Sequence, residues 1–490
     1  MRRIALALGP LLFVTTIATG PFFGMTEAAW HVAGLASWMA VWWLSAVVPL
    51  EATALLPLVM LPLIGTRQLR EVASSYADPV IFLFLGGFLL AATLERWELH
   101  RRFAVTAVRR VGTSAPKVLL AFMIVSALAS MWISNTATAV MMLPIAVALV
   151  RGAGSGELEA VAVAPNAAPA GSPGPPHLGF PTALMLGIAY ACSIGGVATL
   201  IGTPPNAILA GAARELIGVE ITFAGWLLVG LSASIPMLAI CWLWLVRFFK
   251  VSGEVPGLAA VVTREGRSFG RLAGGEKFVI SVFAITALAW VFRAPKEIGN
   301  LRIPGLTDLL PSLSDPIIAI MAALVFFAVP LPKSRFTTAL DWESARKVPW
   351  GILLLFGGGI ALAGAFEVSG LSDWVGGRLA GLRGVPFPLI ILATATIFVF
   401  LTELTSNTAT AALGMPLMAG VAQGLGVAAL PLMAAAALSA SMAFMLPVAT
   451  PPNAIVFGSG AIRSRDMAAA GVGLNLIAVV VISVVVWAWV

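Results

Sequence analysis

Two copies of one polar triplet carry the groups best suited to binding ions. Ser134-Asn135-Thr136 and Ser406-Asn407-Thr408 stand in opposite halves of the chain, each inside a hydrophobic run. Their hydroxyl and amide oxygens can ligate a hard cation, and their O–H and N–H groups can donate hydrogen bonds to an anion. One triplet therefore offers partners for both kinds of ion.

A second polar motif interrupts two other hydrophobic segments. Thr-Pro-Pro-Asn begins at Thr203 and again at Thr450. A proline has no N–H to donate and disfavours helix in the residue before it, so each copy is predicted to break a helix and free backbone groups for ligands. A single triplet is more often a helix cap, and a single Pro-Pro a loop, but two matched pairs favour a binding site. The helix-breaking residues are Pro204, Pro205, Pro451 and Pro452.

The composition indicates what must hold these motifs. Of the 490 residues, 60% are hydrophobic and 10% are charged, against roughly 45–50% and about 25% in a soluble domain. The net charge of +7 comes from Lys and Arg between apolar spans, which argues against nucleic-acid binding. Cys192 and Cys241 lie in apolar segments and the three histidines form no cluster, so neither a disulfide framework nor a transition-metal site is predicted.

The predicted fold class is an all-α polytopic membrane protein with about 11 transmembrane helices and two re-entrant helical hairpins. Segments 118–150 and 386–421 are too long for one crossing, too short for two and polar in the middle, which is typical of such hairpins. Their tips hold the triplets. The other expected spans are 4–22, 31–50, 52–65, 79–94, 181–211, 222–248, 276–293, 314–331, 350–367, 427–460 and 467–490.

The two halves of the chain are related by an inverted repeat. The register that aligns the two triplets also pairs Phe84 with Phe356 and Glu95 with Glu367. Lys and Arg residues before the first span and around the first hairpin predict a cytoplasmic N-terminus and an external C-terminus. The first hairpin then enters from the cytoplasm and the second from outside, as in secondary transporters. The Gly-, Ala- and Pro-rich segment 152–179 is predicted to be a surface loop without a chemical role.

At these motifs the sequence resembles the divalent-anion/sodium symporter family, whose members carry dicarboxylates, citrate and sulfate. The two Ser-Asn-Thr triplets resemble the family's hairpin signature, and ASMAFMLPVATPPNAIV, residues 440–456, resembles its C-terminal signature. The segment WWLSAVVPLEATALLPL is similar to the family's opening motif, except that Ala46 stands where a Glu is usual. We expect this departure to lie outside the site.

The resemblance implies a homodimer in the bacterial inner membrane, with scaffold helices at the interface and a transport domain that moves as an elevator. The scaffold parts would be residues 1–117 and, with the central cytoplasmic linker, 249–385; the transport parts would be residues 118–248 and 386–490. It also implies two sodium sites, the first made by Ser130, Ser134, Asn135 and the backbone of Gly202, the second by Thr402, Thr405, Asn407 and the backbone of Ala449. The substrate would lie among Ser134, Asn135, Thr136, Thr203, Ser406, Asn407, Thr408 and Thr450.

We expect sodium-coupled symport, and Thr at the end of both triplets resembles the carboxylate-carrying members of the family, which implies a C4-dicarboxylate such as succinate, malate or fumarate. No Lys or Arg stands in the four motifs, so bound Na⁺ would supply the positive charge that a dianion needs. A sodium-independent exchanger and a carrier of sulfate or another divalent anion are the alternatives. An enzyme is not predicted because the motifs hold no nucleophile with its base, and an inverted repeat favours a transporter over a channel. Glu403, beside the second triplet, either ligates an ion or pairs with a neighbour.

Overall fold

The computed structural model describes most of the chain. The described residues are 2–22, 24–99, 102–103, 106, 112–152, 179–255, 270–298, 301–332, 334–379, 381 and 383–489. Most of the predicted loop 152–179 and part of the central linker lie outside them.

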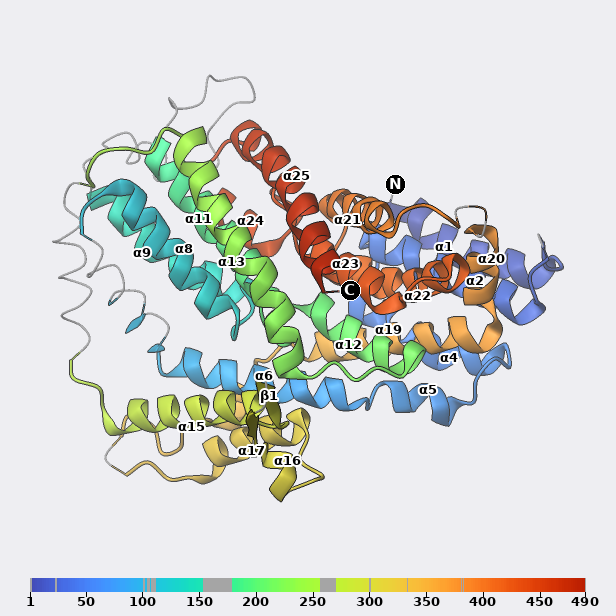
Figure 1. The fold of residues 1–490 in the computed structure, drawn as a ribbon, viewed down its shortest axis with the longest axis horizontal. Coiled ribbons are helices and arrows are strands. Elements are labelled where there is room, and N and C mark those ends of the chain that lie inside the picture. The colour runs from blue at the N-terminus through green and yellow to red at the C-terminus, as the bar shows by residue number, and fades with distance from the viewer. Residues whose placement is uncertain are drawn as a thin grey trace.

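The named elements in the described part of the first half are all helices (Figure 1). Asp78 caps the helix that starts at Pro79, and Ser130 is the last residue of the helix before the first triplet. The helices are α1 (Arg2–Ala18), α2 (Glu27–Ser45), α3 (Leu50–Thr53), α4 (Leu56–Leu63), α5 (Leu69–Ser75), α6 (Pro79–Arg96), α8 (Ala115–Ser130), α9 (Asn135–Gly152), α11 (Gly179–Gly196), α12 (Pro204–Ile217) and α13 (Phe223–Phe248).

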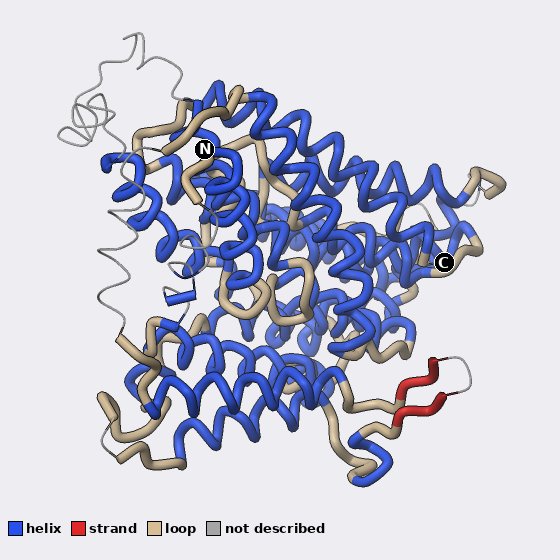
Figure 2. The backbone as a smooth tube through the Cα atoms, turned by 60° about the vertical axis from the view of Figure 1, so that its left-hand side comes forward, coloured by secondary structure: helices blue, strands red, loops and turns tan. Residues whose placement is uncertain are grey.

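The second half repeats this order with additions. A short antiparallel ribbon, in red in Figure 2, was not predicted and pairs Lys296 with Ile303. The elements are α15 (Gly274–Val291), β1 (Lys296–Ile298), β2 (Leu301–Ile303), α16 (Leu306–Leu309), α17 (Asp315–Ala328), α18 (Trp342–Ala345), α19 (Trp350–Ser369), α20 (Leu371–Leu379), α21 (Phe387–Leu404), α22 (Asn407–Leu425), α23 (Ala429–Ala440), α24 (Pro451–Phe457) and α25 (Ser464–Ala488).

Helix starts preserve the sequence register of the repeat. In the register that aligns the triplets, α8 starts level with α21 and α9 starts level with α22. In the register that aligns the Thr-Pro-Pro-Asn motifs, α12 starts level with α24. The predicted hairpins are therefore confirmed as α8–α9 and α21–α22. In Figure 1 the first hairpin lies at the left and the second toward the right.

Three of the predicted spans are interrupted. The spans 181–211 and 427–460 are each two helices broken before Thr-Pro-Pro-Asn, as the prolines predict. The span 52–65 is divided between α3 and α4.

The two halves meet where α6 contacts α19. The rings of Phe84 and Phe356, which are equivalent residues of the repeat, touch edge to face with centroids 5.0 Å apart, and both are fully buried. The packing continues on both sides of these rings, since Tyr76, before α6, contacts Gly357, and Phe88 and Ile352 line the same cavity. A residue can touch its own equivalent only close to the axis that relates the repeats. The axis of the inverted repeat therefore passes between these two rings.

Helix length agrees with a polytopic membrane protein. Within the described residues, seven helical segments are long and apolar enough to cross a membrane, and several shorter apolar helices accompany them. The shorter ones include α8, α9 and α23, which are arms of a hairpin or halves of a broken helix. Such interrupted backbone is tolerated at membrane depth only where protein or a cavity surrounds it. The interrupted helices therefore predict a cavity or a polar site between them.

Candidate functional site

The tip of the first hairpin is fixed by its own side chains. The hydroxyl of Ser130, the last residue of α8, donates to Asn135 Oδ1 over 2.5 Å, and Ser134 Oγ accepts from the N–H of Ala137 at 3.2 Å. Thr199, in the break between α11 and α12, donates to the carbonyl of Met131. The tip and the break are thus held together by hydrogen bonds.

The first break brings a backbone carbonyl to the same place. A Cβ atom on Gly196 would lie 2.5 Å from Asn135 Oδ1 and 3.2 Å from the carbonyl oxygen of Gly202. Only glycine leaves room for these oxygens. Three of the four predicted ligands of the first sodium site, Ser130, Asn135 and Gly202, therefore gather around one small space, with Ser134 in the same tip. Neutral hydroxyl, amide and carbonyl oxygens of this kind suit Na⁺.

The second hairpin repeats this arrangement with different residues. Thr402 Oγ1 lies 2.7 Å from Asn407 Oδ1 and 2.7 Å from the carbonyl oxygen of Ala440. Thr402 is the repeat equivalent of Ser130, so the hydroxyl–asparagine pair occurs in both halves. The hydroxyl of Thr405, the other side-chain ligand predicted here, lies 2.9 Å from the carbonyl oxygen of Leu401 and 2.5 Å from Thr410 Oγ1.

The asparagines of the two Thr-Pro-Pro-Asn motifs hold the breaks open, a role that the sequence did not indicate. Asn206 Nδ2 donates to the carbonyl of Thr199 at 2.7 Å, and Asn453 Nδ2 donates to those of Ala443 and Leu446 at 3.1 Å each. Both asparagines are fully buried. They donate to carbonyl groups of the breaks, which lie outside regular helix. The motif thus breaks the helix with its prolines and stabilises the break with its asparagine.

Glu403 accepts hydrogen bonds from backbone N–H groups and from one side chain. Its carboxylate accepts from the N–H groups of Phe444, Met445 and Leu446 at 2.6, 2.8 and 3.1 Å, and from Asn475 Nδ2 at 2.7 Å. The second break covers residues 441–450, against 197–203 in the first, so it has additional unpaired N–H groups. Met131 occupies the equivalent position in the first half. The carboxylate therefore stabilises the longer break, which is the pairing that the sequence offered as one of two roles for Glu403.

All eight predicted substrate residues line one cavity of about 480 Å³, which we call the motif cavity. Helices α9, α12 and α22 begin beside it, so their positive dipole ends favour an anion there, and the first turns of α9 and α22 contain no proline that would remove an N–H donor. Of the predicted sodium ligands and helix breakers, Ser130, Thr402 and Pro205 do not line it. Its walls include Ser134, Asn135, Thr136, Gly202, Thr203, Pro204, Glu403, Thr405, Ser406, Asn407, Thr408, Ala449, Thr450, Pro451 and Pro452, with Trp43, Phe84 and Phe88.

Ala46 corrects one expectation. It ends α2 with a left-handed backbone, φ 46°, and lines the motif cavity, whereas we expected it to lie outside the site. The error arose because the sequence does not show that the end of α2 reaches the hairpin tips. Among the described residues of this cavity wall, only Glu403 carries an ionisable side chain.

Known membrane transporters are similar in sequence to this chain over almost its whole length. Residues 3–490 match the family model described as the sodium:sulfate symporter transmembrane region. The chain belongs to this symporter family. It is 40% identical over 490 residues to the sodium-dependent dicarboxylate transporter SdcS of Staphylococcus aureus (strain USA300), and 39% identical over 489 residues to SdcS of Staphylococcus saprophyticus. Each alignment covers 99% of this chain and 90% of the relative. The family consists of membrane transporters and not of enzymes.

The fold resembles that of a solved transporter. The YdaH transporter of Alcanivorax borkumensis, whose crystal structure was described as having an unusual topology, superposes with a TM-score of 0.59. The alignment covers 92% of this chain and 97% of that one at 14% sequence identity. The likeness concerns the fold alone.

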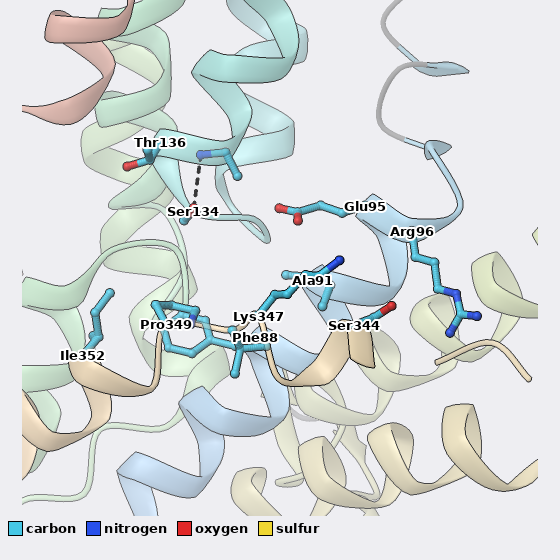
Figure 3. Close-up of a pocket in the computed structure, with 13 residues that line it drawn as sticks. Phe88, Ala91, Glu95, Arg96, Ser134, Thr136, Ser344, Lys347, Pro349 and Ile352 are labelled. Atoms are coloured by element: carbon cyan, nitrogen blue, oxygen red, sulfur yellow. Dashed lines mark hydrogen bonds between the residues drawn. The ribbon is translucent and has the colours of Figure 1, made fainter. Parts of the chain in front are cut away.

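A second cavity adjoins the motif cavity and opens to the surface of this symporter. It has a volume of about 650 Å³, and its wall shares Phe88, Ser134, Thr136 and Ile352 with the motif cavity (Figure 3). We call it the charged cavity because Glu95, Arg96 and Lys347 also line it. Lys347 is exposed, so this cavity reaches solvent at the end where α6 finishes and α19 begins.

One wall of the charged cavity is fixed by an ion pair. Arg96 Nη2 lies 2.7 Å from Asp341 Oδ2, and the guanidinium also covers the ring of Phe336 at 4.1 Å. Burial acts to raise the pKa of Asp341, but the hydrogen bonds from Ser344 and the Arg96 guanidinium hold that pKa below its usual range. The pair therefore stays ionised at neutral pH, and Arg96 is neutralised.

Two ion pairs lie near the start of α6, at the end remote from the charged cavity. Arg67, between α4 and α5, lies 3.1 Å from Glu215 near the end of α12, and Asp78, the cap of α6, lies 3.9 Å from Arg214. Both pairs join α12 to the segment that leads into α6, at the end of α6 remote from Arg96. The motif cavity thus adjoins the charged cavity at one end of α6, and two ion pairs join α12 to the segment before α6 at the other end.

Proposed function

We propose that this symporter couples inward sodium movement to the uptake of a C4-dicarboxylate such as succinate, malate or fumarate. The observation that carries the proposal is the motif cavity, in which eight polar residues from both halves face one space whose described lining contains no Lys or Arg. A dianion there would meet hydroxyl and amide donors and helix N-termini, and would need bound cations to balance its charge. The names of the Staphylococcus relatives support both parts of the proposal.

The two hydroxyl–asparagine pairs are the proposed centres of two sodium sites. The first would use Ser130, Ser134, Asn135 and the carbonyl of Gly202, and the second Thr402, Thr405, Asn407 and the carbonyl of Ala449. In this arrangement each asparagine lies between a sodium ion and the substrate. Sodium bound behind the asparagines would orient them and supply positive charge, so that substrate and sodium favour each other's binding.

Transport would proceed by an elevator movement in a homodimer of the bacterial inner membrane. The moving part would comprise both hairpins, both broken helices, α13 and α25, and the N-terminus would be cytoplasmic and the C-terminus external. The charged cavity at one end of α6 and the ion pairs at the other support this reading, because alternating access requires the two ends of the site to differ.

Uptake of labelled succinate into proteoliposomes tests the coupling. Uptake should require an inward sodium gradient and should fail when potassium or choline replaces sodium outside. Equal rates with all three cations would show a sodium-independent exchanger instead. Unlabelled malate and fumarate should compete, and competition by sulfate without competition by succinate would make the protein a sulfate carrier.

A further inference from the structure

Two charged side chains of the charged cavity have no ionic partner. Arg96 is paired with Asp341, but neither Lys347 nor Glu95 forms an ion pair or a side-chain hydrogen bond within the described part of the chain. Lys347 lies in the turn between α18 and α19, and Glu95 lies in the last turn of α6. The two residues thus bring opposite, unneutralised charges to the walls of one cavity.

Both charges lie on the way to the first hairpin tip. Ser134 and Thr136 of that tip line the same cavity, and in Figure 3 the Glu95 side chain extends from α6 toward the tip while Lys347 stands below it. A sphere with the volume of the charged cavity would be about as wide as the Debye length at 0.1 M salt, which is about 10 Å. An ion that enters the motif cavity through the charged cavity therefore stays within reach of the field of both side chains.

We infer that Lys347 draws the dianionic substrate through the charged cavity into the motif cavity, and that Glu95 opposes the dianion and favours sodium. The inference rests on the proposed function, since it concerns the same substrate. The motif cavity has no cationic side chain among its described lining. Of the two cationic residues that line the adjoining charged cavity, Arg96 is neutralised by Asp341 and Lys347 is not. Its exposure keeps the ammonium hydrated and mobile, which suits attraction and release better than tight binding.

The expected effect is small, dependent on salt and opposite in sign for the two residues. A single charge acting on a dianion across about 10 Å of water changes the binding constant about two- to fourfold at low ionic strength. At about 0.5 M salt the Debye length falls below the size of the cavity and the effect should disappear. Lys347→Gln should therefore weaken dianion binding at low salt, and Glu95→Gln should strengthen it at saturating sodium.

The test measures binding of labelled succinate to the purified full-length protein in nanodiscs. Sodium is kept at one concentration while choline chloride is raised from about 10 mM to about 0.5 M, a range over which screening changes strongly. Lys347→Arg keeps the charge, and Arg346→Gln is the matched control, because it removes an exposed positive charge one residue away that does not line the cavity.

Lys347→Gln alone should raise the succinate Kd about two- to fourfold at low salt, and Lys347→Arg should restore it. An equal effect of Arg346→Gln, an effect that persists at high salt, or a change of the same sign in Glu95→Gln would overturn the inference. Failure of the wild type to need sodium would contradict the proposed coupling and leave this comparison valid. If the wild type bound sulfate in place of succinate, the same series with sulfate, also a dianion, would decide the question.

Discussion

Replacing Gly196 by Ala is the most direct perturbation of the first proposed sodium site. The added Cβ would lie 2.5 Å from Asn135 Oδ1 and 3.2 Å from the carbonyl oxygen of Gly202, closer to the amide oxygen than Cβ atoms come in real structures. Asn135 must then move, and its 2.5 Å hydrogen bond to Ser130 couples the movement of two proposed ligands.

The size of the effect follows from the cost of overpacking. Inserting a methyl group into a well-packed site costs about 1–3 kcal/mol, and about 1.4 kcal/mol corresponds to a tenfold change in an equilibrium constant. If this cost falls on the sodium-bound state, the sodium concentration for half-maximal effect should rise about 5- to 150-fold. Apparent Tm measured against sodium concentration, with succinate uptake beside it, gives that value, because a ligand that binds only the folded state raises Tm.

Gly187→Ala is the matched control for Gly196→Ala. It lies on the same helix, α11, and its Cβ would lie 2.7 Å from Leu119 Cδ1 and 3.1 Å from Met123 Cγ, so it crowds apolar side chains in place of oxygen atoms. Gly187→Ala should lower Tm without moving the sodium midpoint. An unchanged sodium midpoint in Gly196→Ala, or the same shift in both variants, would refute the assignment of the first site.

Three other predictions concern the triplets, Glu403 and the far ion pairs. Thr136→Ala or Thr408→Ala should weaken substrate affinity more than sodium affinity, and Ser134→Ala should do the reverse; identical effects in both titrations would disprove this division. Glu403→Gln should lower the free energy of unfolding by about 2–3 kcal/mol through loss of charge-assisted hydrogen bonds, seen as a lower Tm, whereas Asn475→Ala, which removes one donor of four, should cost less. Arg67→Glu should shift the conformational equilibrium by about 1 kcal/mol, or roughly fivefold. Thiol labelling of Thr405→Cys from the side opposite the charged cavity measures this shift, and adding Glu215→Arg should reverse it. Labelling that does not respond would show that the pair does not hold that end closed.

Sequence patterns were sufficient for the parts of the fold that depend on local chemistry. The triplets mark hairpin tips and the prolines mark helix breaks, since a change from apolar to polar residues or a missing N–H acts within a few residues of its position. The repeat register located the equivalence of Ser130 and Thr402 as well, because helix starts keep their spacing in both halves.

The remaining features depend on which segments approach one another in space. Neither the contact of Glu403 with residues 444–446 nor the place of Ala46 at the cavity has a local signal. Lys347 reads as one more cation at a membrane boundary until α18 and α19 are seen to face α6. In the sequence, a Glu in the last turn of a helix looks the same whether or not its carboxylate binds a distant helix break, so the role of Glu403 has no local signal.

The contact between Phe84 and Phe356 has a consequence for how the duplicated halves could diverge. At the axis each ring packs against its own repeat equivalent. If the two halves arose from two identical copies, one substitution at this position would have altered both sides of the contact. After duplication, a change in either copy must be tolerated by the unchanged other. Away from the axis, equivalent residues pack against different neighbours, so one half can change alone. Glu403 in the second half is thus the equivalent of Met131 in the first. We therefore expect the two halves to be most alike in sequence at the axis, as Phe84 and Phe356 are, and to differ most around the helix breaks, as Met131 and Glu403 do.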